Sequence, residues 1–96
     1  MRLRWLSLAI ADLVALRAYI ARDNPAAAAE VARRIRQAVE LLQGQVGMGR
    51  PGRVDGTKEL VISGTPYIVP YRVKNGEVQV LRVLHGSRRW PKEFRT

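Results

Sequence analysis

The sequence contains no cysteine and only one histidine, His85. Without cysteine the chain can form neither disulfides nor thiolate metal sites. One histidine also falls short of the ligand set of a zinc site, which usually combines Cys, His and carboxylate groups. We therefore expect a protein without a bound metal and without a cofactor.

Long apolar runs are also missing. No segment approaches the roughly 18 apolar residues that a membrane-spanning helix needs. The N-terminal stretch "MRLRWLSLAIADL" is apolar, but Asp12 interrupts it, and its pattern continues as an amphipathic helix rather than as a signal peptide. A chain of 96 residues has room for one modest core. We expect a single domain over residues 1–96, cytoplasmic and without a membrane partner.

Acidic residues are scarce: 8 Asp and Glu stand against 17 Lys and Arg, which gives a net charge of +9. A charge of this size indicates a polyanionic partner, either a nucleic acid or an acidic protein. A basic, well-solvated surface without such a partner is the alternative.

Hydrophobic periodicity predicts the order β-α-α-β-β-β. Alternation predicts a strand over residues 1–6, and apolar residues at helical spacing predict two helices. Ser7 is the expected cap of the first helix, and Asn24, followed by Pro25, that of the second. Residues 44–56, with five glycines, read as a loop. Three strands are expected over residues 58–63, 67–73 and 77–85. The predicted fold is α+β, an antiparallel sheet with a helical hairpin packed on one face.

Asn75-Gly76 is a strong signal for a two-residue type I′ turn, and it predicts the pairing of the last two strands. Counting from this turn, residue 73 faces 78, 71 faces 80, 69 faces 82 and 67 faces 84. On this register Arg72 and His85 project from the face that the helices leave uncovered. Pro70 requires a sheet edge or a bulge, and a bulge would shift the pairing beyond it.

The segment "HGSRRWPKEFRT" interleaves cations with aromatic residues. Such a combination can bind phosphates and stack on bases, although Trp90 and Phe94 could instead complete the core and the cations could be solvated. A lone imidazole such as His85 is more often structural, but it can also transfer protons near neutral pH. Cleavage of RNA by its 2′-hydroxyl needs such a group, with cations to stabilise the transition state.

The element order, together with "YIARDNP", "GRPGRVDGTKELVISGTPYIVPYRV" and "VLRVLHGSRRWP", resembles the RelE/ParE superfamily, the toxins of bacterial type II toxin–antitoxin modules. The resemblance covers almost the whole chain. It implies a cognate antitoxin, a hetero-oligomeric toxin–antitoxin complex, and one of two targets. RelE-like members cut mRNA on the ribosome, whereas ParE-like members poison DNA gyrase.

For this chain the resemblance favours a ribosome-dependent mRNA endonuclease, with the gyrase inhibitor as the alternative. Ile68 stands where RelE-like nucleases often carry arginine, which keeps the alternative open. The expected catalytic residues are His85, Arg72 and Arg88. The expected RNA-binding residues are Arg50, Arg53, Lys58, Arg89, Trp90 and Lys92.

Overall fold

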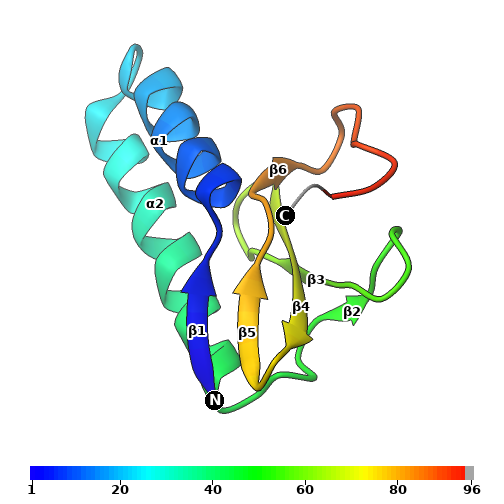
Figure 1. Cartoon of the computed structure of the whole chain (residues 1–96). Helices are drawn as coiled ribbons and strands as arrows, with labels where there is room; N and C mark the ends of the chain where they lie inside the picture. The colour runs from blue at the N-terminus through cyan, green and yellow to red at the C-terminus, as the bar shows by residue number, and fades with distance from the viewer. Residues whose placement is uncertain (95–96) are drawn as a thin grey trace.

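The computed structural model describes residues 1–94 and contains two long helices beside a six-stranded sheet (Figure 1). Arg95, which belongs to the basic C-terminal segment, lies outside the described residues. The elements in chain order are β1 (Arg2–Trp5), α1 (Ser7–Ala21), α2 (Pro25–Glu40), the short 3₁₀ helix η1 (Leu41–Gln43), β2 (Arg50–Pro51), β3 (Lys58–Val61), β4 (Tyr67–Lys74), β5 (Glu77–Val80) and β6 (Leu84–His85).

The predicted α+β fold with a helical hairpin on one sheet face is confirmed. The strand order is β1-β5-β4-β3-β2, and β6 pairs with the far end of β4. β3, β4 and β5 pair antiparallel in chain order, as expected, but β1 lies parallel to β5, so the sheet is mixed. Hairpin signals determine only neighbouring strands, whereas the partner of β1 is chosen by tertiary packing. Within residues 1–94, neither helix is long and apolar enough to cross a membrane.

The two helices begin differently. The side chain of Asn24 accepts a hydrogen bond from the Ala27 N–H at 3.0 Å, and Pro25 is the first residue of α2, as predicted. The predicted cap at Ser7 is wrong, because Ser7 is already helical and the preceding Leu6 makes no side-chain cap. The N-cap position falls on Leu6, whose aliphatic side chain cannot accept a hydrogen bond.

The apolar residues at helical spacing in both helices face the sheet. The buried core is formed by α1, α2, η1 and one face of the strands: Ala9, Leu16, Ile35, Val39, Leu42, Leu60, Ile62, Val69, Tyr71, Val78, Val80 and Val83. Leu13, Ile20 and Val31 pack against its margin. Spacing of three and four residues places such side chains on one side of a helix, which is why the stripes could be read from the sequence.

The segment between α2 and β3 contains structure that the sequence did not indicate. Arg50 and Pro51 form β2, which pairs with Glu59 and Lys58 of β3. The hydroxyl of Tyr71 donates to the Val46 carbonyl at 2.7 Å and accepts from the Gly49 N–H at 2.9 Å. Tyr71 therefore anchors the first half of the loop to the sheet, at Val46 and at Gly49.

The Asn75-Gly76 turn has the predicted conformation, with φ of 54° and 72°. Both residues are left-handed, as a type I′ turn requires. The predicted pairs next to the turn are confirmed, since Tyr71 faces Val80 and Val73 faces Val78.

Beyond Pro70 the predicted register is wrong by one residue. Tyr67 pairs with His85, and Ile68 with Leu84. Pro70 accepts a hydrogen bond from the Leu81 N–H at 2.9 Å but has no N–H to return one, so the ladder is weakened there. Residues 81–83 leave the strand as a β-bulge with one extra residue. The bulge turns His85 to the helix-covered side, opposite to the face predicted for it.

Candidate functional site

His85 lies beside α1. Its ring meets Tyr67 edge-on, with 5.7 Å between the ring centroids. Its Nδ1 accepts a hydrogen bond from the Ser87 N–H at 3.2 Å and lies 2.9 Å from the Ser87 hydroxyl. One ring nitrogen is therefore occupied within the chain, which fixes the orientation of the imidazole.

Arg88 and Arg89 line the same cleft as His85, together with Tyr19 of α1 and Tyr67. The cleft has a volume of about 410 Å³. The Arg88 guanidinium carbon is 5.9 Å from the centre of the Tyr19 ring. The cleft thus combines cations with aromatic rings, a composition suited to an anionic or nucleotide-like group.

Arg72 is not part of this cleft. It belongs to the opposite sheet face, where its Nε donates to the Gln79 side chain at 2.8 Å. It lies five positions along β4 from Tyr67, the partner of His85, which is a distance of roughly 16 Å along an extended strand. Of the three expected catalytic residues, the structure brings His85 and Arg88 together and leaves Arg72 apart.

A buried carboxylate organises the arginines of the β2 region. Glu59 is only 2% exposed, and it accepts from Arg50 Nη2 at 3.1 Å and from the Arg53 backbone N–H at 2.7 Å. The Arg53 guanidinium also stacks on the Trp90 ring, 3.8 Å from its centre. The indole N–H of Trp90 donates to the His85 carbonyl at 3.0 Å.

These contacts fold the C-terminal segment back toward β2 and β3, on the side of the molecule away from the helical hairpin (Figure 1). Trp90 is half-buried against Arg53. The remaining expected RNA-binding residues are dispersed. Lys58 pairs with Tyr71 and so points to the opposite side of β3 from Glu59, and Lys92 is exposed in the tail.

Sequence reasoning missed the polar residues that orient the arginines. Glu77 and Gln79 are 9% and 4% exposed, and they contact Arg4 at 3.4 Å and Arg72 at 2.8 Å respectively. The available signal was the alternation of "EVQV" and the glutamate of "KELV", which places polar groups opposite the core face of each strand.

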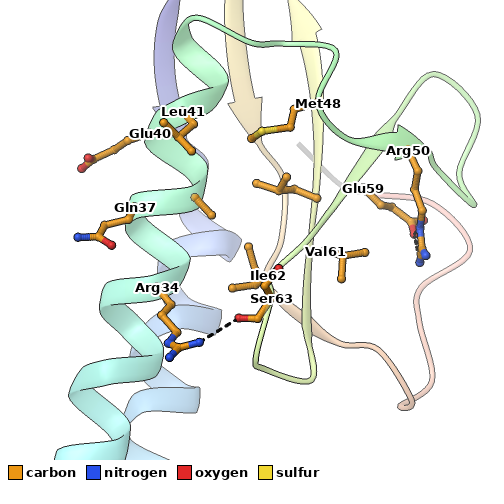
Figure 2. Close-up of a pocket in the computed structure, with 12 residues that line it drawn as sticks. Arg34, Gln37, Glu40, Leu41, Met48, Arg50, Glu59, Val61, Ile62 and Ser63 are labelled. Atoms are coloured by element: carbon orange, nitrogen blue, oxygen red, sulfur yellow. Dashed lines mark hydrogen bonds and ion pairs between the residues drawn. The ribbon is translucent and has the colours of Figure 1, made fainter.

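A groove of about 930 Å³ lies between α2 and β3 (Figure 2). Its apolar surface includes Leu41, Met48 and Val61, which are 55%, 39% and 50% exposed. Arg34 at one end donates to the Ser63 carbonyl at 3.4 Å, and Arg50 lies at the other end beside Glu59. Because β2 pairs only with Lys58 and Glu59, the edge of β3 is open to the groove after Glu59 in the described part of the chain.

Comparisons with known proteins agree with this fold. Residues 3–90 match the family described as ParE toxin of type II toxin-antitoxin system, parDE. A putative toxin, Y4kP of Sinorhizobium fredii, is 44% identical over 94% of this chain and 93% of its own length. Toxin RelE2 of Caulobacter vibrioides is 36% identical over 88% of this chain and 93% of its own length.

A solved structure, described as the chromosomal ParDE TA system from P. aeruginosa, superposes with a TM-score of 0.78. It is 36% identical and covers 86% of this chain and 92% of its own. The family match spans most of the chain and agrees with the fold, and the protein therefore belongs to the ParE toxins of type II toxin–antitoxin systems, whose partner is a cognate antitoxin.

Proposed function

We propose that this toxin acts by binding rather than by chemistry, and that its target is DNA gyrase. The observation that carries the proposal is the separation of His85 from Arg72, which lie on opposite faces of the sheet. Cleavage of RNA needs a proton-transfer group and stabilising cations that converge on one phosphate. Family membership in the ParE toxins supports gyrase over the ribosome.

Supercoiling of relaxed plasmid by purified gyrase tests this directly. The full-length toxin should inhibit supercoiling in proportion to its concentration, and prior addition of the cognate antitoxin should restore activity. In cells, induction should cause filamentation and an SOS response while messages stay intact. Unchanged gyrase activity in the presence of excess toxin would rule the target out.

Ribosome-dependent cleavage of mRNA is the second candidate, and one observation favours it. His85 and Arg88 line one cleft with Tyr19 and Tyr67, so a proton-transfer group and a cation do lie together. Mapping mRNA 5′ ends within minutes of induction would reveal cleavage. If cleavage occurs, His85→Ala and Arg88→Ala should abolish it, and Arg72→Ala, from the other face, should not.

We propose that the antitoxin docks a segment in the groove between α2 and β3. The groove offers exposed apolar side chains, an open strand edge and cations at its ends. An extended segment with apolar and acidic residues suits such a surface, since it could add a strand to β3 and place carboxylates near Arg34 and Arg50.

Substitution in the groove tests the docking site. Val61→Lys should weaken antitoxin binding at least tenfold, because a cation would replace an apolar contact. Val14→Lys is the matched control, since Val14 is 64% exposed on α1, away from the groove. Equal binding by both variants would place the antitoxin elsewhere.

A further inference from the structure

The face of the sheet away from the helices carries a basic surface. We call it the basic face and define it as Arg2 and Arg4 of β1, Arg50 of β2, Arg53, and Arg72 and Lys74 of β4. Pairing places Arg4, Gln79 and Arg72 in one row across β1, β5 and β4. The next row contains Arg2, Glu77 and Lys74 in the same way.

Buried polar side chains hold these cations in position. The Glu77 carboxylate lies 3.4 Å from Arg4 Nη1 and accepts from the Gln79 amide at 2.8 Å. The Gln79 carbonyl oxygen in turn accepts from Arg72 Nε. Because Arg72 is held through Nε, the two terminal nitrogens of its guanidinium remain available as a fork of donors.

Glu59 holds the two arginines in the second part of the basic face, Arg50 and Arg53, in position. Their side chains remain 52% and 47% exposed, while the Glu59 carboxylate itself is buried. The side chain of Arg4 is 60% exposed. The carboxylates are thus inside and the guanidinium groups outside, which leaves the face positive and orients its donors toward solvent.

The spacing and composition of the basic face favour a phosphate backbone over stacked bases. The row that contains Arg4 and Arg72 spans two strand spacings, so the backbones of these two residues are about 10 Å apart. This distance is comparable to the widths of the DNA grooves, which are roughly 6 to 12 Å. The strand aromatics Trp5, Tyr67 and Tyr71 belong to the helix-covered side, in or against the core. Trp90 is already covered by Arg53.

Single-strand binding proteins combine cations with exposed aromatic platforms, and the strands of this face offer none. Arginine forks without a stacking surface suit duplex DNA, whose phosphates stay on the outside. We infer that the basic face contacts the phosphate backbone of duplex DNA, without reading its sequence, through guanidinium groups that Glu59, Glu77 and Gln79 hold in position. This contact with DNA is a property separate from gyrase inhibition, although the proposed gyrase–DNA complex is where the toxin would meet duplex DNA.

Fluorescence anisotropy with a short mixed-sequence DNA duplex, in a series of salt concentrations, tests the inference on the full-length toxin. Each phosphate contact contributes about 0.9 to the slope of log affinity against log salt. Arg4→Gln with Arg72→Gln should therefore lower that slope by about 2 and the affinity at least tenfold. Arg17→Gln with Arg36→Gln, on the helices, removes the same charge and should change affinity less than about threefold.

A charge-neutral variant separates orientation from net charge. Gln79→Met keeps the volume but removes the acceptor for Arg72. It should weaken duplex binding severalfold at unchanged net charge, with a folded state verified by thermal unfolding. The inference would be overturned if Arg4→Gln with Arg72→Gln bound duplex DNA no more weakly than the helix control. It would also be overturned if that variant bound the antitoxin more weakly while its DNA binding stayed unchanged. The second result would assign the basic face to an acidic peptide.

Comparison with a single strand of the same length adds a further check, since tighter binding to the single strand would contradict the duplex assignment. The gyrase assay remains a separate measurement. DNA binding that depends on the basic face, without gyrase inhibition, would remove the proposed target and leave this inference standing. Gyrase inhibition, together with DNA binding that does not depend on the basic face, would overturn this inference and leave the proposed target standing.

Discussion

The carboxylate of Asp12 on α1 accepts two hydrogen bonds from the Arg82 guanidinium, at 2.7 and 3.0 Å. The same carboxylate accepts from the Val83 N–H at 2.9 Å. Arg82 and Val83 belong to the bulge between β5 and β6, where the ladder with β4 is interrupted. Asp12 therefore supplies an acceptor that the missing strand partner would otherwise provide, and it ties the bulge to the helical hairpin.

Asp12→Ala should destabilise the fold by about 2 to 4 kcal/mol, because it leaves a part-buried guanidinium and a backbone N–H without their acceptor. Urea denaturation followed by circular dichroism measures the change. Asp23→Ala, at the exposed junction of the two helices, serves as the control and should cost less than about 0.5 kcal/mol. Equal effects of the two substitutions would contradict the role assigned to Asp12.

Tyr71 should make stability fall at high pH. Burial raises the pKa of Tyr71, and the hydrogen bond from Gly49 opposes the shift only in part. Since the folded-state pKa lies above the unfolded value near 10, the stabilising contribution is complete below about pH 10 and is lost as pH rises through the folded pKa.

Absorbance of tyrosinate follows this titration, and one of the three tyrosines should ionise last. Tyr71→Phe should remove the late step and cost about 1 to 3 kcal/mol at neutral pH, because the Val46 carbonyl and Gly49 N–H lose their partner. A late step that persists in Tyr71→Phe would assign it to another tyrosine.

Glu30 should make stability fall in acid. Hydrogen bonds from Arg33 and then Arg34 lower the pKa of Glu30 to about 2. Its contribution is present above the unfolded pKa of about 4.3 and is lost as pH falls through the folded value. Glu30→Gln should therefore flatten the pH dependence of unfolding between about pH 4 and 2. Glu40→Gln, at the other end of α2, is the control for the loss of a carboxylate.

Gly76→Ala should destabilise the protein by about 1 to 2 kcal/mol, because φ is 72° and a Cβ in this conformation is strained. A Cβ at this site would meet no neighbour within 4 Å, so the cost is purely conformational. Gly44→Ala is the control, with φ of −109° and equally open space. Thermal unfolding of both variants should separate them clearly.

Arg53→Met should loosen the C-terminal segment. It removes the cation from the Trp90 ring while keeping the length of the side chain. A half-exposed cation–π contact contributes about 0.5 to 1 kcal/mol, so hydrogen exchange of the Arg88 amide should accelerate about two- to fivefold. Arg89→Met removes a nearby cation that is not stacked on Trp90, and it should leave this exchange rate unchanged.

Local rules predicted those parts of the fold that depend on neighbouring residues. Asn24 capped α2 as its sequence position indicated, and Asn75-Gly76 set the register as far as Pro70. The parallel partner of β1, the two-residue strand β2 and the extra residue of the bulge depend on contacts distant in sequence. Pro70 indicated a disturbance of the pairing, but the direction of the shift could not be read from the sequence, because the bulge is held by Asp12, 71 residues from Val83.

The site residues also divide into those that neighbouring residues predict and those that depend on contacts distant in sequence. Arginines on the uncovered sheet face could be anticipated from strand alternation, and Arg72 is an example. His85 was assigned to the wrong face because a shift of one residue reverses every side chain beyond it. Strand alternation places Glu59 and Glu77 opposite the core face, but it does not indicate that they are buried, because a buried acid is recognisable only when its arginine partners are known.

The pairing of β1 with β5 has a consequence for the order of synthesis. Arg2 is made 75 residues before its strand partner, Glu77. β1 therefore stays unpaired until β5 has been made, and the sheet cannot be completed earlier. Such a long-range pairing slows folding, because the entropy cost of closing the chain must be met before the contact between the two strands forms.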